Sequence, residues 1–466
     1  MAYNGGKLSF LEEEEKKMVH ENSLKVLSEV GVRVDNEAAL TLFAEKGADV
    51  DHEEELVKLS PKMVEKSIET APSQVTLYGR KEEHNIELGG TRVHMGTGGT
   101  AVNVLDLDTG KKREAISGDV ANTARLVQNL ENIDFYVIPV FPADAGKEGA
   151  DEARFFNALK NTTKHVMGGV YTLEGIKNVV DAAEKIAGSE EELREKPFIS
   201  FIANIMSPLS MERDYTEYFR YAVERGIPVM GPPAPIAGAT SPITLPGTIV
   251  QTNAEALFTV TFSQVIESGA RTLYSVVPTT MDMQTSDFRF GSIEMGMMNA
   301  ACAEMARYYD LPIYNTAGVS DAKVPDVQAG YEKMSNVMLS ALVGANYIHD
   351  AAGLLNSGMC VAYEQYVIDN QILGIASRVL RGLEFSEDRM AFDEIKEAGP
   401  GGNFLTSDST LKYMRSEFYN DVLHENKDWD DWVEEGSPDA RERARDIARE
   451  ILAREGEAFV DESMFN

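Results

Sequence analysis

A rhythm of short apolar runs separated by longer amphipathic stretches constrains the fold of this chain most. Several of the runs are apolar throughout, as a parallel strand buried on both faces requires. Eight such runs lie at residues 92–95 (which 101–105 could extend), 135–140, 165–170, 198–203, 227–230, 271–277, 312–314 and 345–349. The main helix-length stretches between them are 117–130, 174–187, 216–225, 252–268, 295–309 and 328–343. The pattern predicts an α/β fold, a (β/α)8 TIM barrel, with an open doubly wound sheet as the alternative.

The regions on either side of this rhythm are expected to be extensions of the barrel. Residues 8–70 have helical spacing, and residues 74–95 alternate in the manner of a hairpin. After the last unit, closed by a helix over 359–381, further helices are expected at 408–419 and 438–454. We therefore expect a helical and hairpin extension at 1–90, a catalytic barrel at 91–385 and a C-terminal helical extension at 386–466.

Composition excludes several classes of function. The 466 residues include 44 Lys and Arg against 76 Asp and Glu, a formal net charge of −32, so nucleic acid and anionic membranes are not expected partners. No apolar run of about 18 residues and no secretion signal is visible, which favours the cytoplasm. The two cysteines, Cys302 and Cys360, lie far apart and are expected to be buried free thiols.

Functional residues of a TIM barrel follow the strands, at their carboxyl ends. Small residues dominate these positions in the sequence, which leaves room for a bulky planar group close to the backbone. The segments are 96–100, 142–144, 171–172, 204–208, 231–233, 278–280, 315–318 and 349–353. The glycine spacing in the first of them is GxGG rather than GxGxxG, so nucleotide binding is a weaker interpretation.

Histidines and aromatic residues near the strand ends are the other candidates. None of the seven histidines has the spacing of a metal site, and no bound metal is expected. His349 ends the eighth run beside Asp350, and either a binding role or a structural role fits it. An aromatic box for a quaternary ammonium is a further hypothesis, weighed against ordinary core packing. Its candidates are Tyr171, Tyr274, Phe288, Phe290 and Tyr314.

Three longer segments resemble a known family. GTGGTAVNVLD at 96–106, KVPDVQAGYEK at 323–333 and YEQYVIDN at 363–370 are similar to the trimethylamine methyltransferase superfamily, in particular to members that lack pyrrolysine. The resemblance implies a TIM-barrel enzyme that moves a methyl group from an amine to the Co(I) of a separate corrinoid protein. In the trimethylamine enzymes pyrrolysine is expected within the stretch that corresponds to 315–321.

This sequence contains no pyrrolysine, which points to the quaternary amines used by the other members. Glycine betaine is the first candidate, and proline betaine, carnitine and similar betaines are alternatives. A quaternary ammonium is already fully charged, so Co(I) displaces a neutral tertiary amine and no proton has to be delivered. No Asp-x-His-x-x-Gly motif for binding cobalamin is present, so the corrinoid should arrive on a partner or be supplied free.

Position at the strand ends selects the candidate site residues. For substrate binding they are Asn204, Tyr274, Asn315 and His349. For loops that face the corrinoid they are Gly96, Gly98, Gly99 and Gly318. No catalytic residue is assigned. A barrel lyase or hydrolase using acidic residues at this end, and a non-catalytic betaine-binding protein, remain competing hypotheses, and a homo-oligomer is expected.

Overall fold

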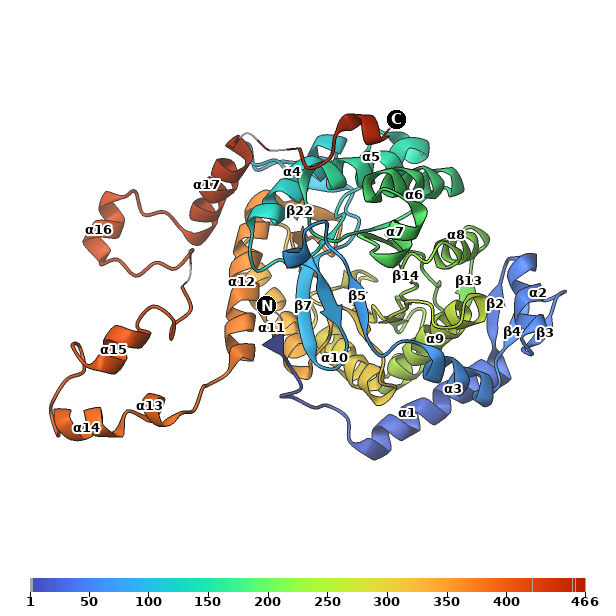
Figure 1. Ribbon diagram of the computed structural model, residues 1–466, viewed down its shortest axis with the longest axis horizontal. Coiled ribbons are helices and arrows are strands. Elements are labelled where there is room, and N and C mark those ends of the chain that lie inside the picture. The colour runs from blue at the N-terminus through green and yellow to red at the C-terminus, as the bar shows by residue number, and fades with distance from the viewer. Residues whose placement is uncertain (1–2, 421, 455, 457, 466) are drawn as a thin grey trace.

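The computed structural model describes residues 3–420, 422–454, 456 and 458–465, and it contains the eight strand-and-helix units that the sequence predicts (Figure 1). The strands are β7 (Arg92–Thr97), β10 (Tyr136–Val137), β11 (Val166–Gly169), β12 (Ile199–Ile202), β14 (Val229–Met230), β16 (Tyr274–Ser275), β19 (Ile313–Thr316) and β20 (Tyr347–Ala352). The helices that follow them are α4 (Ser117–Asn129), α5 (Gly146–Asn161), α6 (Leu173–Ala187), α8 (Arg213–Glu224), α9 (Leu245–Ile266), α10 (Ile293–Tyr308), α11 (Val327–Val343) and α12 (Tyr363–Arg381). Helix α5 is the one that the apolar spacing did not indicate.

These strands pair in parallel in two series. One series runs β7-β20-β19-β16 and the other β10-β11-β12-β14. Parallel bridges from Gly96 to Phe135 and from Ala101 to Val140 join the two series where β7 meets β10. Beyond β14 and β16 the amide of Val277 donates to the carbonyl of Pro233, at 2.9 Å. The fold is therefore a mixed α/β fold whose central strands are all parallel.

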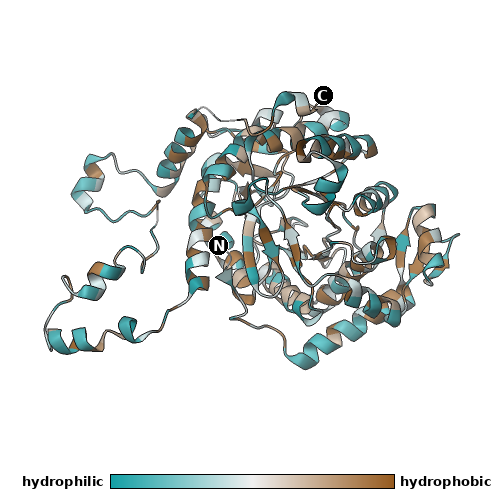
Figure 2. Cartoon of the chain, viewed as in Figure 1, coloured by the Kyte–Doolittle hydropathy of each residue, from teal (hydrophilic) through white to brown (hydrophobic). Residues whose placement is uncertain are grey.

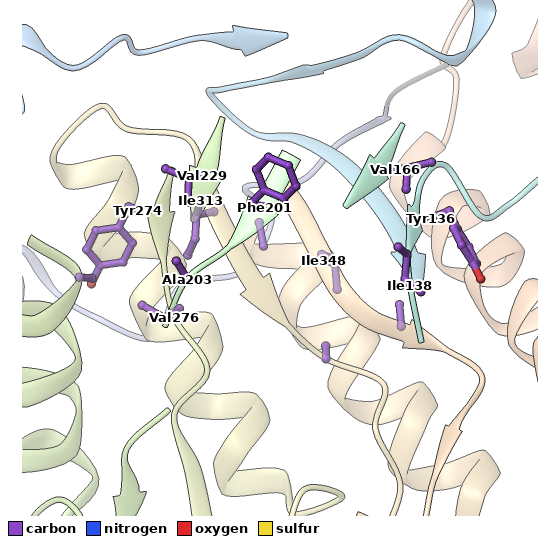
Figure 3. Packing of buried hydrophobic residues seen from close by; sticks show 14 of the residues in the cluster. Tyr136, Ile138, Val166, Phe201, Ala203, Val229, Tyr274, Val276, Ile313 and Ile348 are labelled. Carbon is purple, nitrogen blue, oxygen red and sulfur yellow. The ribbon is translucent and has the colours of Figure 1, made fainter. Parts of the chain in front are cut away.

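Each central strand is buried on both faces, which explains its continuous apolar sequence. On the outer face residues such as Tyr136, Phe201, Ile313 and Ile348 pack in the core shared with the helices (Figure 3). On the inner face a second cluster contains Phe135, Val137, Met167, Met230, Leu273, Tyr314 and Tyr347. Hairpin strands β5 (Val75–Leu77) and β6 (Ile86–Leu88) add Val75, Leu77, Ile86 and Leu88 to this inner cluster. The predicted hairpin therefore covers the amino ends of the central strands.

The N-terminal extension combines helices with a small sheet. Helices α1 (Glu13–Lys25), α2 (Glu37–Glu45) and α3 (Pro61–Thr70) confirm the helical spacing. Strands β2 (Val32–Val34), β3 (Asp49–Asp51), β4 (Leu56–Lys58) and β13 (Ser210–Met211) form a four-stranded sheet beside them. Its strands have two or three residues each, too few for a visible alternation in the sequence. Helix α1 is mainly hydrophilic (Figure 2), and only one narrow apolar stripe of it is buried. This stripe packs against the body, by which we mean the central strands and the helices that follow them.

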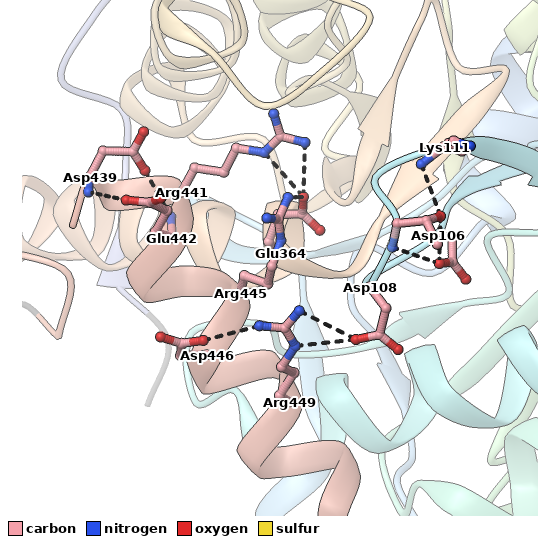
Figure 4. Close-up of polar contacts among 11 residues, drawn as sticks. Asp106, Asp108, Lys111, Glu364, Asp439, Arg441, Glu442, Arg445, Asp446 and Arg449 are labelled. Atoms are coloured by element: carbon pink, nitrogen blue, oxygen red, sulfur yellow. Dashed lines mark hydrogen bonds and ion pairs between the residues drawn. The ribbon is translucent and has the colours of Figure 1, made fainter. Parts of the chain in front are cut away.

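The C-terminal helix α17 (Ala440–Ala453) returns to the body and packs on α12. Glu364, which is 1% exposed, lies 3.2 Å from Arg441 and 3.3 Å from Arg445, and Arg449 lies 3.3 Å from Asp108 (Figure 4). Because a buried carboxylate must be paired, these contacts fix α17 against the start of α12.

Residues 383–420 and 422–437, which we call the arm, extend away from the body between α12 and α17 (Figure 1). The arm contains α13 (Glu387–Met390), α14 (Phe392–Ala398), α15 (Asp408–Tyr413) and α16 (Trp429–Glu434), and none of these four helices has a buried residue. The helix expected at 408–419 therefore ends at Tyr413, without an apolar face to continue against.

Short elements complete the fold. They are β1 (Tyr3–Asn4), β8 (Asn103–Leu105), β9 (Lys112–Glu114), β15 (Ile236–Ala237), β17 (Thr279–Met281), β18 (Phe288–Arg289), β21 (Leu354–Leu355), β22 (Cys360–Ala362), α7 (Glu190–Glu195), a π-helical turn (Val26–Val30) and 3-10 turns (Glu82–His84 and Glu462–Phe465). Cys302 and Cys360 are free and buried, as predicted. Among the residues described, no helix is both long enough and apolar enough to cross a membrane.

Candidate functional site at the carboxyl ends of the strands

His349 occupies the inner face of β20 above a column of aromatic rings. Its imidazole stacks on Tyr314 with ring centroids 4.8 Å apart, Tyr314 stacks on Tyr347 at 5.5 Å, and Tyr347 stacks on Phe135 at 3.6 Å. These rings fill the inside of the strands below His349. The imidazole is 7% exposed, and its Nδ1 atom has no hydrogen-bond partner. A buried polar atom without a partner is costly in a protein interior and marks a place where a ligand could supply one.

The contacts of Nε2 determine which nitrogen of His349 carries the proton. The amide of Gly99 donates to Nε2 at 3.1 Å, which requires a lone pair there. Asp350 Oδ1 lies 3.0 Å from the same nitrogen, and this contact would require a proton instead. One nitrogen cannot satisfy both, and only the contact from Gly99 has the geometry of a hydrogen bond, so the tautomer that fits it carries its proton on Nδ1. His349 then offers a free N–H at Nδ1, and Asp350 Oδ1 is left as a carboxylate oxygen without a donor.

Asp350 is held in an unusual backbone conformation. Its φ is 67°, in the left-handed region, where a residue with a side chain is strained. Thr316 Oγ1 donates to Asp350 Oδ2 at 2.8 Å and fixes the carboxylate. Gly98 makes the arrangement possible, because a Cβ there would lie 2.1 Å from Asp350 Oδ1 and 2.5 Å from its backbone nitrogen. Backbone strain of this kind is concentrated at functional sites.

A buried arginine and two aromatic rings stand beside this pair. The Arg154 guanidinium donates to the carbonyls of Ile138 (3.1 Å), Val140 (3.2 Å) and Gly169 (2.5 Å) at the ends of β10 and β11. It also reaches Thr100 Oγ1 at 3.4 Å, next to Gly99, and lies 5.2 Å from the centre of the Tyr171 ring.

Tyr171 in turn meets Phe141 edge to face at 5.2 Å, and both rings are partly exposed. A contact network thus connects His349 with an aromatic pair that solvent can reach. The sequence indicated Tyr171 but not Arg154 or Phe141, because an arginine within a helix and a single Phe after a strand carry no distinguishing pattern.

Two of the four predicted substrate-binding residues lie on the inner side of the strands. His349 is one, and Asn204 is the other, because Phe201 and Ala203 of the same segment pack outward with the helices. Asn204 is partly exposed, and its Oδ1 is buried without a partner. It therefore resembles His349 in having an unsatisfied polar atom.

The structure does not bring the other two to this group. Asn315 Nδ2 donates to the carbonyl of Asn299 on α10 at 2.9 Å, and the Tyr274 hydroxyl donates to Asn253 on α9 at 2.8 Å. Both side chains face the helices, because successive residues of a strand point to opposite faces and Tyr314 and Leu273 occupy the inner face. We therefore leave Asn315 and Tyr274 out of the site.

The four glycines predicted to face a corrinoid are closely covered by the protein itself. A Cβ on Gly96 would lie 2.3 Å from the Phe135 ring, one on Gly99 would lie 2.8 Å from Leu354, and one on Gly318 would lie 2.8 Å from the Cα of Ala351. With Gly98 they let β7, β20 and the loop after β19 approach one another. Their orientation toward a corrinoid stays a prediction.

Comparison with known proteins places the chain in a family. The family described as "Trimethylamine methyltransferase (MTTB)" matches residues 3–465. This chain belongs to the trimethylamine methyltransferase family. The prediction drawn from the three sequence segments is confirmed.

Relatives in this family are similar over almost their whole length. The chain is 35% identical over 445 residues to trimethylamine methyltransferase MttB of Desulfitobacterium hafniense (strain DSM 10664 / DCB-2), covering 96% of this chain and 89% of the relative. It is 31% identical over 448 residues to glycine betaine methyltransferase of Desulfitobacterium hafniense (strain Y51), covering 96% and 93%. The crystal structure of Methanosarcina barkeri monomethylamine methyltransferase has the same fold, with a TM-score of 0.55 at 12% identity, covering 96% of this chain and 88% of that one.

Two of the segments that resemble the trimethylamine methyltransferase family meet in a buried ion pair. Lys333 and Asp369 lie 3.0 Å apart, and both side chains are fully buried. Lys333 Nζ also donates to the carbonyl of Gly318, and Asp369 Oδ2 accepts from the amide of Gly353 at 2.7 Å. Burial raises the pKa of Asp369, against the opposing effect of Lys333. The pair therefore holds Gly318, in the loop after β19, close to Gly353, which directly follows β20.

In this family member a second buried carboxylate anchors the loop after β12. Glu255 on α9 accepts hydrogen bonds from the amide of Leu209 (2.8 Å), the hydroxyl of Ser207 (2.7 Å) and the side chain of Gln251 (3.0 Å). Burial raises the pKa of Glu255 to about 7, although these three donors oppose the rise. The loop that begins with Asn204 is therefore tied to a group that titrates near neutral pH.

Proposed function

We propose that this protein transfers a methyl group from a quaternary amine, with glycine betaine as the first candidate, to the Co(I) of a separate corrinoid protein. Membership of the family supports methyl transfer as the reaction. A relative of 31% identity is named for glycine betaine, whereas one of 35% identity is named for trimethylamine. Identity therefore does not choose between the two amines, and the choice rests on the residues of this chain.

The unpartnered atoms of His349 and Asp350 carry the proposal. The Nδ1 proton of His349 suits a carboxylate, and the free Oδ1 of Asp350 suits a cation, so the pair offers complementary groups to a zwitterion. Asn204 adds a side-chain amide on the inner side, and Phe141 and Tyr171 supply aromatic rings for a quaternary ammonium. Glycine betaine has both a carboxylate and a trimethylammonium group. Trimethylamine has no carboxylate to meet His349.

The reaction balances without an acid or a base from the protein. The Co(I) electron pair forms a bond to the methyl carbon, and the C–N bond breaks with its electrons staying on nitrogen. The amine leaves as a neutral tertiary amine. The protein has to bind the cation, orient one methyl group outward and exclude water, which are contributions of position rather than of proton transfer.

A closed (β/α)8 barrel, with residues 91–385 as its catalytic core, is part of the proposal. It is supported by the bridges between β7 and β10 and by the bond from Val277 to Pro233. Closure would gather the ends of all eight strands around His349. The acidic surface, with a net charge of −32, would favour a cationic substrate and a partner with a basic docking face.

Incubation with free cob(I)alamin and a panel of amines tests the function. The panel contains glycine betaine, proline betaine, carnitine and trimethylamine, and formation of methylcobalamin is followed by its absorption spectrum. We expect methylcobalamin and dimethylglycine from glycine betaine, and none from trimethylamine. Methyl transfer from trimethylamine alone would contradict the substrate class. Binding of betaine without turnover would favour the binding-protein hypothesis, and cobalt-independent breakdown would favour the lyase or hydrolase.

A further inference from the structure

A polar cavity lies at the amino ends of the strands, opposite to the end that carries His349. It has a volume of about 690 Å³ and is bounded by residues 82–87, which run from a 3-10 turn into β6, by the start of β7 and by the segment 128–134 that leads into β10. Lys164, just before β11, completes its lining. The stacked rings of Phe135 and Tyr347 separate this end from His349. The proposed methyl transfer makes no use of this cavity.

Negative groups predominate on the lining. Glu82, Glu83, Glu87 and Glu131 are exposed around the rim, and Asp134 lies further in. The positive groups are Arg92 and Lys164, but Lys164 is not free to bind an anion. Its Nζ donates to the carbonyls of Val127 (2.7 Å), Leu130 (2.9 Å) and Ile133 (2.5 Å), which uses all three of its N–H bonds. The cavity therefore complements a cation.

Two polar atoms of the lining without a hydrogen-bond partner, one on Asp134 and one on His94, are interpreted as acceptors. Asp134 Oδ2 accepts a hydrogen bond from the amide of Met95 at 2.9 Å and lies 3.6 Å from His94 Nδ1. Because a carboxylate attracts a proton, this contact favours the tautomer of His94 that carries its proton on Nδ1. His94 is only 6% exposed, and its Nε2 has no partner. Nε2 is then an acceptor, as is the second oxygen of Asp134. The ligand that completes them must bring N–H or O–H donors.

A metal ion is a poor match for this lining. Within the described part of the chain, no group of three or more His, Cys, Asp or Glu side chains is placed to hold a metal ion. The glutamates of the rim are spread along a turn and a helix end rather than gathered around one point. Several separated negative charges fit a ligand with several separated positive charges.

We propose that this cavity binds a protonated alkyl diamine or polyamine, with one ammonium N–H group at Asp134 and His94 and the other ammonium groups at the rim glutamates. This chemistry differs from that of the site at His349, because a quaternary ammonium has no N–H to donate. The two sites therefore select different amines, and the second site is independent of the proposed methyl transfer.

Calorimetric titration of the full-length protein with putrescine tests the proposal. The matched probe is 1,4-bis(trimethylammonio)butane, which has the same two charges on the same chain but no N–H group. The titration is done at physiological salt, which weakens non-specific attraction of cations to the exposed acidic surface. We then expect saturable binding of putrescine and at least tenfold weaker binding of the quaternary probe. Equal affinity for the two probes, or no saturable binding of putrescine, would overturn the proposal.

Variants locate the site. Asp134→Asn keeps an oxygen for the amide of Met95 and should weaken putrescine binding at least tenfold. Because an inner variant could disturb folding, the exposed pair Glu82→Gln/Glu83→Gln is compared with the equally exposed pair Glu53→Gln/Glu54→Gln. Only the first pair should weaken binding, by several fold. An unchanged Kd in Asp134→Asn, or equal losses in the two pairs, would refute the site.

His349→Ala separates this proposal from the proposed function. It should leave the putrescine affinity unchanged, because the aromatic column lies between the two sites. If no amine supports methyl transfer while putrescine still binds, the proposed function fails and the second site stands. If His349→Ala abolishes putrescine binding, the amine binds at the carboxyl end and the second site is refuted.

Discussion

Glu255 makes the stability of this protein depend on pH, and Glu255→Gln should remove that dependence. Gln can keep all three contacts, because its oxygen accepts from Leu209 and Gln251 and its NH2 group donates to the hydroxyl of Ser207. The variant therefore removes the titrating group and leaves the loop after β12 anchored.

The direction in which the free energy of unfolding changes with pH follows from the raised pKa of Glu255. The pKa of Glu255 is about 7 in the folded protein against 4.5 for an ordinary glutamate. Between these values the unfolded chain loses a proton that the folded chain keeps, so stability is present in full below about pH 4.5 and is lost as pH rises through 7. At 1.36 kcal/mol per pH unit the loss amounts to roughly 3 kcal/mol. The unfolding entropy of a 466-residue chain is about 1 kcal/mol/K, so this corresponds to roughly 3 °C.

Thermal unfolding of both proteins from pH 5 to pH 8 checks the prediction. The wild-type midpoint should fall relative to that of Glu255→Gln by roughly 2–3 °C over this range, mainly between pH 5 and pH 7, and should level off above the folded pKa of about 7. Other titrating groups affect both proteins alike, so only the difference between the two midpoints is used. A difference that stays constant with pH would show that Glu255 does not titrate in this range and would refute the argument from burial.

Three further predictions concern the site and its anchors. His349→Ala should raise the KM for glycine betaine at least tenfold without lowering the thermal midpoint by more than a few degrees, and an unchanged KM would remove His349 from the site. Gly98→Ala should lower kcat/KM at least tenfold, because its Cβ would displace Asp350, whereas Gly118→Ala, with nothing nearer than 3.9 Å, should have no effect on activity. Lys333→Met leaves Asp369 buried and unpaired and should cost about 3–5 kcal/mol of unfolding free energy. The double variant Lys333→Met/Asp369→Leu should recover at least half of that loss, and equal midpoints for the single and double variants would contradict the pairing.

Strand positions could be predicted from the sequence, but side-chain directions could not. A parallel strand buried on both faces reads as an apolar run, which located all eight central strands. In the segment Ile313–Thr316 the choice between Tyr314 and Asn315 as the inward residue depends on the register with β20, and a shift of one residue reverses it. Asn315 and Tyr274 were selected by position alone, and both face helices.

Contacts between distant segments were the other feature hidden from the sequence. Lys333 and Asp369 lie in two segments that carry the family resemblance, but nothing in either segment shows that the two residues pair. Arg154 is an ordinary-looking helix residue until the strand ends surround it. His349 could be selected because the end of a strand is a position that the sequence does reveal, whereas the role of its neighbour Asp350 depends on contacts with Gly98 and Thr316.

Hairpin β5–β6 bears on the order in which molecules arrive and leave. It covers the amino ends of the strands, and the rings of Phe135, Tyr347 and Tyr314 fill the space above it, so His349 is approached from the carboxyl side alone. On the proposed function, the amine and the corrinoid partner use that same side. The amine must then enter before the partner docks, and the demethylated product must wait until the partner departs. An excess of the partner would block the amine and act as a competitive inhibitor of the reaction that needs it.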